Sequence, residues 1–238
     1  MKTTAILLCA GSGNRMRGRV SDKILAEVQG RPVFAYSLEA FKATRKIHHY
    51  VVVYRDEPQR EMLEEIFGGI SKKPVSWVRG GEERQISVLN ALEGTPEDTD
   101  TVLIHDCARP LVTVGALKSV LKAAEEDKSA VLAHRVVDTI KEVLDIHQIR
   151  QAKLTNLERS KLWAMETPQG FSFKLILGAY RKLLEENIQV TDDTAAVIHF
   201  DYPVTVVENF SPNPKITLPE DLALIEFLLE QRKAQTSQ

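Results

Sequence analysis

Short apolar runs alternate with helical patterns over most of this sequence. Five of the runs are rich in β-branched residues and short enough for buried strands: residues 3–9, 50–54, 75–78, 101–104 and 130–133. Between them, apolar residues recur at helical spacing in residues 33–41, 58–67, 84–92 and 114–124. Buried strands that alternate with helices predict an α/β fold with a mostly parallel sheet and helices on both faces. Ligands of such folds bind at the carboxyl ends of the strands.

One segment, residues 138–162, departs from this alternation because it is polar and has no helical pattern. We interpret it as an extended arm or hairpin inserted in the domain. Beyond it the sequence predicts a strand at 162–165, helices at 173–186 and 193–199, a strand at 204–207 and a last helix from about Pro219. The prediction is one Rossmann-like domain over residues 1–238, with 138–162 as a protruding arm.

Composition excludes several classes of protein. A net charge of −2 gives no field for binding a polyanion, so nucleic acid is not an expected partner. No segment approaches the ~20 apolar residues of a membrane span, and the apolar run at 5–10 is too short for a signal peptide. Two cysteines, Cys9 and Cys107, show no metal-ligand spacing and fit a reducing, cytoplasmic compartment.

The first predicted strand leads into a glycine-rich loop, residues 9–16, whose backbone N–H groups can approach a phosphate chain. A dinucleotide-binding fingerprint would need glycine in place of Met16, which disfavours a nicotinamide-dependent oxidoreductase. A P-loop would need Lys and Ser or Thr where Arg19 and Val20 stand. The loop is dense in cations, which suit either a phosphate site or a solvated basic loop: Arg15, Arg17, Arg19 and Lys23.

Two further motifs follow predicted strands. Gly80-Gly81 opens a helix that carries Ser87, and backbone amides at such a turn can bind a base or phosphate, although a plain strand–helix turn fits equally. Asp106 ends the fourth strand and is a candidate for Mg²⁺ or a ribose hydroxyl. Arg109 could be its ion-pair partner, whereas His105 is more typical of a hydrogen-bonded structural histidine.

Three polar motifs complete the set: residues 167–169, 191–193 and 213–217. Thr191 and Thr217 could each be a helix N-cap. No such structural role explains Lys215.

Taken in order, these motifs resemble the 2-C-methyl-D-erythritol 4-phosphate cytidylyltransferases of the non-mevalonate isoprenoid pathway. The resemblance covers residues 3–226 and rests on six short motifs: residues 10–16, Gly80-Gly81-x-x-Arg84-x-x-Ser87-Val88, His105-Asp106-x-Ala108-Arg109-Pro110, Thr167-Pro168-Gln169, Thr191-Asp192 and Asn213-x-Lys215-Ile216-Thr217. Each motif is weak alone, and together they identify the chain as a member of this family.

The resemblance implies a set of roles. CTP would be bound by Leu8, Cys9, Ala10, Gly11, Gly13, Gly80, Glu82, Arg84, Ser87 and Asp106, the last also facing Mg²⁺. The polyol phosphate would be held by Arg109, Thr139, Arg159, Thr167 and Thr191. Four cations would stabilise charge on the transferring group: Arg15, Lys23, Arg159 and Lys215. The family is dimeric, and its arm carries Thr139 and Arg159 into the neighbouring subunit's site.

The sequence departs from the family pattern after the glycine loop, which is one residue longer. Lys23 is the choice for the loop lysine, with Arg19 as the rival. A phosphate monoester is largely anionic at neutral pH, so the implied attack on the α-phosphorus of CTP needs no general base. Two other functions stay open, a cytidylyltransferase for ribitol 5-phosphate and a non-catalytic nucleotide-binding paralogue.

Overall fold

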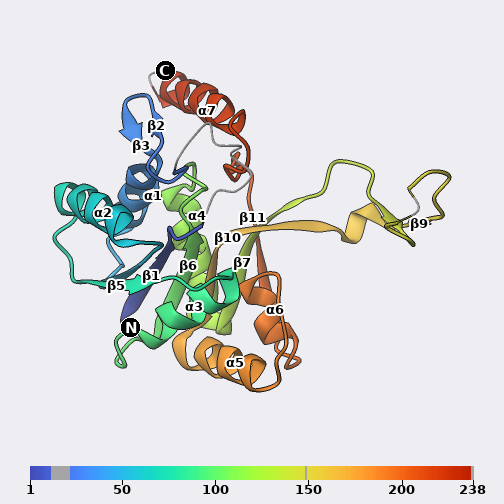
Figure 1. Cartoon of the computed structure of the whole chain (residues 1–238), viewed down its shortest axis with the longest axis horizontal. Helices are drawn as coiled ribbons and strands as arrows, with labels where there is room; N and C mark the ends of the chain where they lie inside the picture. The colour runs from blue at the N-terminus through green and yellow to red at the C-terminus, as the bar shows by residue number, and fades with distance from the viewer. Residues whose placement is uncertain (12–21, 148, 237–238) are drawn as a thin grey trace.

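A seven-stranded sheet forms the centre of the molecule (Figure 1). The computed structural model describes residues 1–11, 22–147 and 149–236. The strand order is β11-β7-β10-β6-β1-β4-β5. The strands are β1 (Thr3–Leu8), β4 (His49–Tyr54), β5 (Val75–Arg79), β6 (Thr101–Asp106), β7 (Ser129–Arg135), β10 (Trp163–Ser172) and β11 (Thr205–Glu208). Every neighbouring pair is parallel except those of β10, which runs antiparallel to β6 and β7. The predicted mostly parallel sheet is confirmed.

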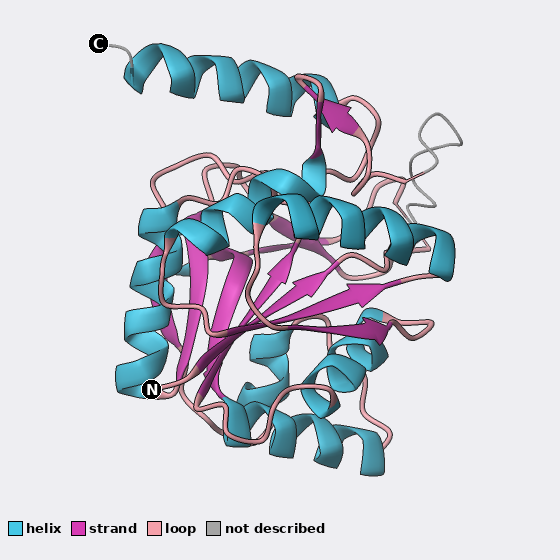
Figure 2. Ribbon diagram, turned by 90° about the vertical axis from the view of Figure 1, so that its left-hand side faces the viewer, coloured by secondary structure: helices cyan, strands magenta, loops and turns pink. Residues whose placement is uncertain are grey.

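Helices cover both faces of the sheet, as predicted (Figure 2). Helices α1 (Val33–Ala43), α2 (Glu57–Ile70) and α4 (Val114–Asp127) pack on one face. The other face is covered by α3 (Arg84–Glu93), α5 (Phe173–Glu185) and α6 (Asp193–Ile198). Side chains of a strand alternate between the faces, so Leu7 and Cys9 enter the first core and Ile6 the second.

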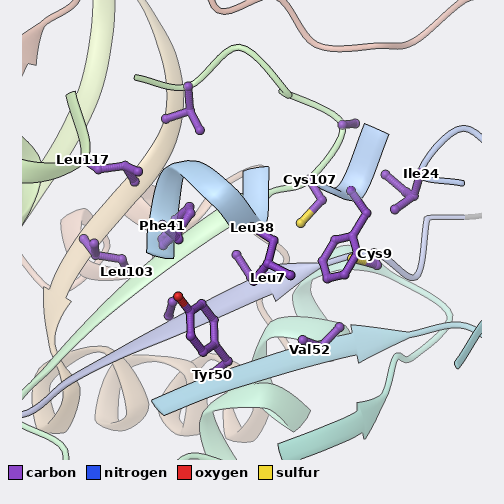
Figure 3. Close-up of a cluster of buried hydrophobic side chains, with 14 of the residues drawn as sticks. Leu7, Cys9, Ile24, Leu38, Phe41, Tyr50, Val52, Leu103, Cys107 and Leu117 are labelled. Atoms are coloured by element: carbon purple, nitrogen blue, oxygen red, sulfur yellow. The ribbon is translucent and has the colours of Figure 1, made fainter. Parts of the chain in front are cut away.

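The larger core lies between α1 and the sheet (Figure 3). In α1, Phe34, Leu38 and Phe41 recur at helical spacing and are fully buried. They contact a layer that includes Tyr50 and Val52 of β4. Large side chains at this spacing explain why residues 33–41 fold as a helix against this sheet and not as a further strand.

Side-chain caps fix where several helices begin. The carboxylate of Asp56 accepts a hydrogen bond from the Gln59 amide at 2.9 Å and begins α2. The hydroxyl of Thr113 accepts one from Ala116 at 3.1 Å and begins α4. The last helix, α7 (Asp221–Thr236), begins two residues later than predicted. Asp221 accepts bonds from the amides of Thr217 and Leu218, so Thr217 is not the N-cap.

Strand β10 is longer than the sequence predicted. The expected strand ended at residue 165, whereas the structure continues it through Ser172. Pro168 lacks the N–H that a sheet ladder needs and therefore masked the strand in the sequence. The register with β7 shifts between Met165 and Gln169, and this irregularity accommodates the proline. A small antiparallel pair, β2 (Glu27–Val28) and β3 (Arg31–Pro32), was not predicted either.

The chain between β7 and β10 extends away from the body of the molecule (Figure 1). It holds an antiparallel pair, β8 (Lys141–Val143) and β9 (Leu154–Asn156), and a 3₁₀ turn, η2 (Arg159–Lys161). This segment exposes Ile140, Leu144, Ile146, Ile149, Leu154 and Leu157. Among the described residues no helix is long and apolar enough to cross a membrane.

The packing of α1 predicts a strong response to truncation of Phe41. Its ring is 0% exposed, so Phe41→Ala should leave a cavity and lower the free energy of unfolding by about 3–5 kcal/mol. Phe210→Ala is the control, because that ring is 86% exposed and its loss should change stability by less than about 0.5 kcal/mol. Urea unfolding of both variants measures the difference, and equal midpoints would contradict this account of the core.

Candidate active site

A cavity of about 640 Å³ opens at the carboxyl ends of β1, β4 and β6. Its position is the one that a parallel sheet predicts for a ligand. Nine residues that the sequence analysis assigned to nucleotide or phosphate binding line it: Leu8, Ala10, Gly11, Lys23, Glu82, Arg84, Ser87, Asp106 and Lys215. Gly13, Arg15 and the rival cation Arg19 lie outside the described residues.

Asp106 is the best-buried charged group of this cavity. It ends β6 beside Leu8 of β1, and its side chain is 12% exposed. Lys215 Nζ lies 2.5 Å from one carboxylate oxygen and Arg84 Nε 3.3 Å from the other. Burial disfavours the charged carboxylate, but Arg84 and Lys215 outweigh it and hold the pKa of Asp106 well below its usual range. Asp106 is therefore an anion at neutral pH.

Arg84 connects Asp106 to a second buried carboxylate. Its two terminal nitrogens donate to the two oxygens of Asp193 at 2.8 and 2.7 Å, and Tyr180 donates to the same carboxylate at 2.5 Å. Burial opposes the charge on Arg84, yet Asp193 and Asp106 hold the pKa of the guanidinium well above its usual range. Asp193 is 0% exposed, so this bidentate pair is a buried ion pair. The family resemblance assigned Arg84 to nucleotide binding, and the sequence did not indicate that it also forms a buried ion pair with Asp193.

Lys23 reaches the cavity from the segment that follows the glycine loop. Its ammonium lies 3.4 Å from the carbonyl of Ile216, beside the motif that carries Lys215. The preceding Asp22 fixes the segment, because its carboxylate accepts bonds from the Ile24 amide and from the side chains of Gln59 and Arg55. Arg55 also lines the cavity and was not predicted, since no motif marks the end of β4 in the sequence.

The two glycines after β5 permit a close approach of two loops. A Cβ on Gly80 would lie 2.5 Å from the Cβ of Ala10, and one on Gly81 would lie 2.4 Å from Cγ2 of Ile86. The Gly81 amide donates to the Ser87 hydroxyl at 3.0 Å. Gly80 itself does not line the cavity, and its amide donates to the backbone carbonyl oxygen of Tyr54. Cys9 is likewise fully buried in the core, so its side chain cannot touch a ligand.

Thr167 lies beneath Asp106 and is almost fully buried. Its hydroxyl accepts a bond from the Asp106 amide at 3.1 Å and lies 3.0 Å from Nδ1 of His105. Burial lowers the pKa of His105 to about 4, so the imidazole is neutral at neutral pH. His105 is thus a buried structural histidine that also contacts Ser37, and Thr167 supports Asp106 from below.

Arg109 is not the ion-pair partner of Asp106 that one interpretation of the sequence expected. It donates from Nη1 to the carbonyl oxygen of Asn213 at 2.7 Å, and Arg84 and Lys215 take the place next to Asp106. Its buried Nε finds no hydrogen-bond partner among the described residues. Arg109 does not line the cavity, and this nitrogen faces the interior of the protein.

Thr191 is not the N-cap of α6. The carboxylate of Asp192 takes that position, accepting a bond from the Ala195 amide at 2.9 Å and one from Gln169 at 2.9 Å. Thr191 lines a second hollow, beside Met165 and Val190. Helix caps favour both residue types, and the sequence alone did not distinguish them.

Thr139 and Arg159 lie on the extended segment, and neither lines the cavity. Arg159 is exposed and donates from Nη1 to the carbonyl oxygen of Val137 at 3.0 Å. Within the described ranges, no group of three or more His, Cys, Asp or Glu side chains could hold a metal ion.

The cavity therefore combines several cations with the buried carboxylate of Asp106. Lys23, Arg55 and Lys215 come from three different loops and can neutralise a chain of phosphates. The turn at Gly81 and the end of β1 offer backbone groups that can bind a base edge. No residue of the described cavity has the pairing of a nucleophile with a base, so the arrangement suits phosphoryl or nucleotidyl transfer by positioning and electrostatics.

Comparison with known proteins gives a consistent result. The family model for 2-C-methyl-D-erythritol 4-phosphate cytidylyltransferase matches residues 3–231. The enzyme of that name from Caldanaerobacter subterraneus is 38% identical over 97% of this chain and 100% of its own length. The one from Synechococcus elongatus is 37% identical over 96% of each chain.

Solved structures agree. The crystal structure of 4-diphosphocytidyl-2C-methyl-D-erythritol synthase from Anaerococcus prevotii superposes with a TM-score of 0.84 at 26% identity, covering 96% of this chain and 98% of that one. That of 2-C-methyl-D-erythritol 4-phosphate cytidylyltransferase from Thermus thermophilus gives 0.74 at 28% identity, covering 94% and 98%.

The Arg84–Asp193 pair predicts a large loss of stability when one partner is removed. Among the described residues, Arg84→Leu leaves the fully buried Asp193 carboxylate with the hydroxyl of Tyr180 as its side-chain partner, and it should cost about 3–5 kcal/mol of unfolding free energy. Arg181→Leu is the control, because Arg181 pairs with Glu93 where both side chains are about half exposed, and it should cost less than about 1 kcal/mol. Chemical denaturation compares the two, and an equal cost would show that the buried pair is not structural.

Proposed function

The chain belongs to the 2-C-methyl-D-erythritol 4-phosphate cytidylyltransferase family, and we propose that it joins CTP to 2-C-methyl-D-erythritol 4-phosphate with release of pyrophosphate. The observation that carries this proposal is the convergence in one cavity of Lys23, the choice for the loop lysine, with Asp106 and Lys215, which stand in two of the family motifs. We expect the enzyme to serve the non-mevalonate pathway of isoprenoid synthesis in the cytoplasm. The two free, buried thiols of Cys9 and Cys107 suit that reducing compartment.

The cavity suggests how CTP would lie. The backbone of Leu8–Ala10 and of the turn before Ser87 would frame the cytosine, since backbone donors and acceptors can distinguish base edges. Asp106 would face the ribose. Lys23 would bind the triphosphate from one side and Lys215 the α-phosphate from the other.

The reaction would be attack by the phosphate oxygen of the polyol phosphate on the α-phosphorus of CTP. That oxygen is largely anionic at neutral pH because its second pKa is near 6, so no side chain needs to remove a proton. The protein must hold two anions together and stabilise the charge on the transferring group. Lys23 and Lys215 would do so on the CTP side, and Arg109 would bind the polyol phosphate, as the family resemblance implies.

Mg²⁺ is the metal that this site would accept. It prefers oxygen ligands and commonly binds through one or two carboxylates together with substrate phosphates. Asp106 offers an ionised carboxylate to the cavity, so it would hold the ion together with CTP. The ion would neutralise charge on the phosphates.

The extended segment at 138–162 would act as a dimerisation arm. Two strands of three residues each are marginal in water, and the segment exposes several apolar side chains, so it is expected to pack against another surface. We propose a second copy of the chain related by two-fold symmetry. The arm would then bring Thr139 and Arg159 to the partner's cavity, next to the polyol phosphate.

Pyrophosphate release tests the proposed reaction. With Mg²⁺ present, CTP and methylerythritol phosphate should give a kcat/KM at least about a hundredfold above that with UTP, ATP or GTP, because a base-reading site leaves buried polar groups unpaired with the wrong base. Ribitol 5-phosphate should be at least about tenfold poorer than methylerythritol phosphate. Equal or better turnover of ribitol 5-phosphate would favour the alternative cytidylyltransferase. Nucleotide binding without pyrophosphate release would favour a non-catalytic paralogue.

Mixed dimers test the shared site. Lys23→Ala and Arg159→Ala chains, each nearly inactive, are unfolded and refolded together so that half the dimers contain one of each. In a mixed dimer one site carries both lesions and the other neither, so about a quarter of wild-type activity should return. Refolding each variant alone is the control. Activity no higher than the average of the two parents, with subunit exchange verified, would place both residues in one chain's site.

A further inference from the structure

A second polar cluster lies beside the active-site cavity, centred on Glu166 of β10. The side chain of Glu166 is 4% exposed and accepts from three partners. Oε2 accepts from Nδ2 of Asn209 at 2.9 Å and from Nδ2 of Asn213 at 2.8 Å. Oε1 lies 2.6 Å from Nδ1 of His134. A buried carboxylate is costly unless it is fully hydrogen-bonded, and this one is bonded at both oxygens.

The cluster is joined to the proposed machinery through Asn213. Its side chain also donates to the carbonyl oxygen of Thr167 at 3.1 Å, and its own carbonyl oxygen accepts from Arg109 at 2.7 Å. Two residues later comes Lys215, whose ammonium contacts Asp106. Asn213 thus links Glu166 to Arg109 by hydrogen bonds and to Lys215 by the chain.

The segment that carries Asn213 and Lys215 has no regular secondary structure. Residues 209–217 follow β11 without helix or strand, so no ladder of backbone hydrogen bonds fixes them. Their backbone contacts to the rest of the fold include the amide of Asn209 to Ala133 and that of Ile216 to Ala108. Between these two backbone anchors, the carboxylate of Glu166 accepts from the side chain of Asn213 and so holds the middle of the segment.

We propose that Glu166 is a positioning residue for cytidylyl transfer, which places Arg109 and Lys215 by holding Asn213 against β10. This inference rests on the proposed function. Glu166 touches neither substrate in this arrangement and acts through Asn213. Burial lowers the pKa of the Arg109 guanidinium, and Asp106 and Glu166 oppose that change with their negative charge. Glu166 therefore helps to position Arg109 through Asn213, and its negative charge favours the charged form of the guanidinium.

Two substitutions at Glu166 distinguish the hydrogen bonds that its carboxylate accepts from the volume that its side chain fills. Glu166→Leu keeps the approximate volume but removes the oxygen that accepts from both asparagine amides, and kcat/KM for the polyol phosphate should fall at least about tenfold. Glu166→Gln retains an oxygen that can accept from the two asparagine amides, so kcat/KM should stay within about threefold of wild type. Because Lys215 would bind the α-phosphate of CTP, the stabilisation of the protein by CTP, read as the shift in Tm, should be smaller in Glu166→Leu and retained in Glu166→Gln.

Asn209 and Asn213 form a matched pair that tests whether Glu166 acts through Asn213. Both donate to the same oxygen of Glu166, but only Asn213 also accepts from Arg109 and precedes Lys215. Asn213→Ala should reproduce the loss in kcat/KM seen in Glu166→Leu, and Asn209→Ala should leave it within about threefold. The double variant Glu166→Leu with Asn213→Ala should be no slower than the slower single variant, because residues that act as one unit are not additive.

The kinetic constants decide between positioning and mere stability. If Glu166 only stabilises the fold, the variants will unfold at lower temperature while the folded fraction keeps wild-type kcat and KM, and the proposal is overturned. Equal losses for Asn209→Ala and Asn213→Ala would overturn the route through Asn213. If Glu166→Leu does not fold, the asparagine pair decides alone. Failure of the wild-type protein to release pyrophosphate would instead contradict the proposed function.

Discussion

The buried carboxylate of Asp106, held between Arg84 and Lys215, is the interaction on which the site depends. It joins the end of β6 to the start of α3 and to the segment after β11. Through Arg84 the same network reaches Asp193 at the start of α6, so four segments distant in sequence meet at two carboxylates and two cations. Buried charges stabilise a fold only when their partners are all present, which makes this network sensitive to the loss of any member. It also fixes the cavity wall before a substrate arrives, as catalysis by preorganised charge requires.

Another part of the site is formed by two closely packed backbone segments. The loop after β1 and the turn after β5 approach so closely that Gly80 cannot carry a side chain beside Ala10. Their backbone groups therefore border the cavity, which Lys23, Arg55 and Lys215 also line. The chain has a net charge of only −2, so the positive field is local and comes from a few loops. Such a site attracts a nucleotide without making the whole surface a polyanion binder.

The sequence predicted the sheet and the place of Asp106 well because both follow from local patterns. Short apolar runs identify buried strands, and a parallel sheet brings their carboxyl ends to one edge, so the motifs had to converge there. Long-range pairings could not be predicted in this way. Arg84 and Asp193 are 109 residues apart, and each looked like part of a separate motif. Pro168 hid the second half of β10, and only the register shift opposite β7 shows how a strand can contain it. The roles of Glu166 and Arg55 escaped notice because neither stands in a glycine-rich or charged motif.

The extended segment is hard to explain from the fold of one chain alone, and the proposed dimer explains it. Its two strands have three residues each and pair only with one another, while apolar side chains such as Ile146 and Ile149 face outward. Conformational entropy opposes ordering a hairpin of this size unless apolar area is buried in return. The sheet of its own chain gives it little such area, because the segment points away from the body (Figure 1). A second subunit would supply that area, and the same contact would bring Arg159 close to bound polyol phosphate. In this proposal, the apolar side chains that stabilise the dimer and the cation that completes the site lie on one segment, so assembly and substrate binding depend on the same contact.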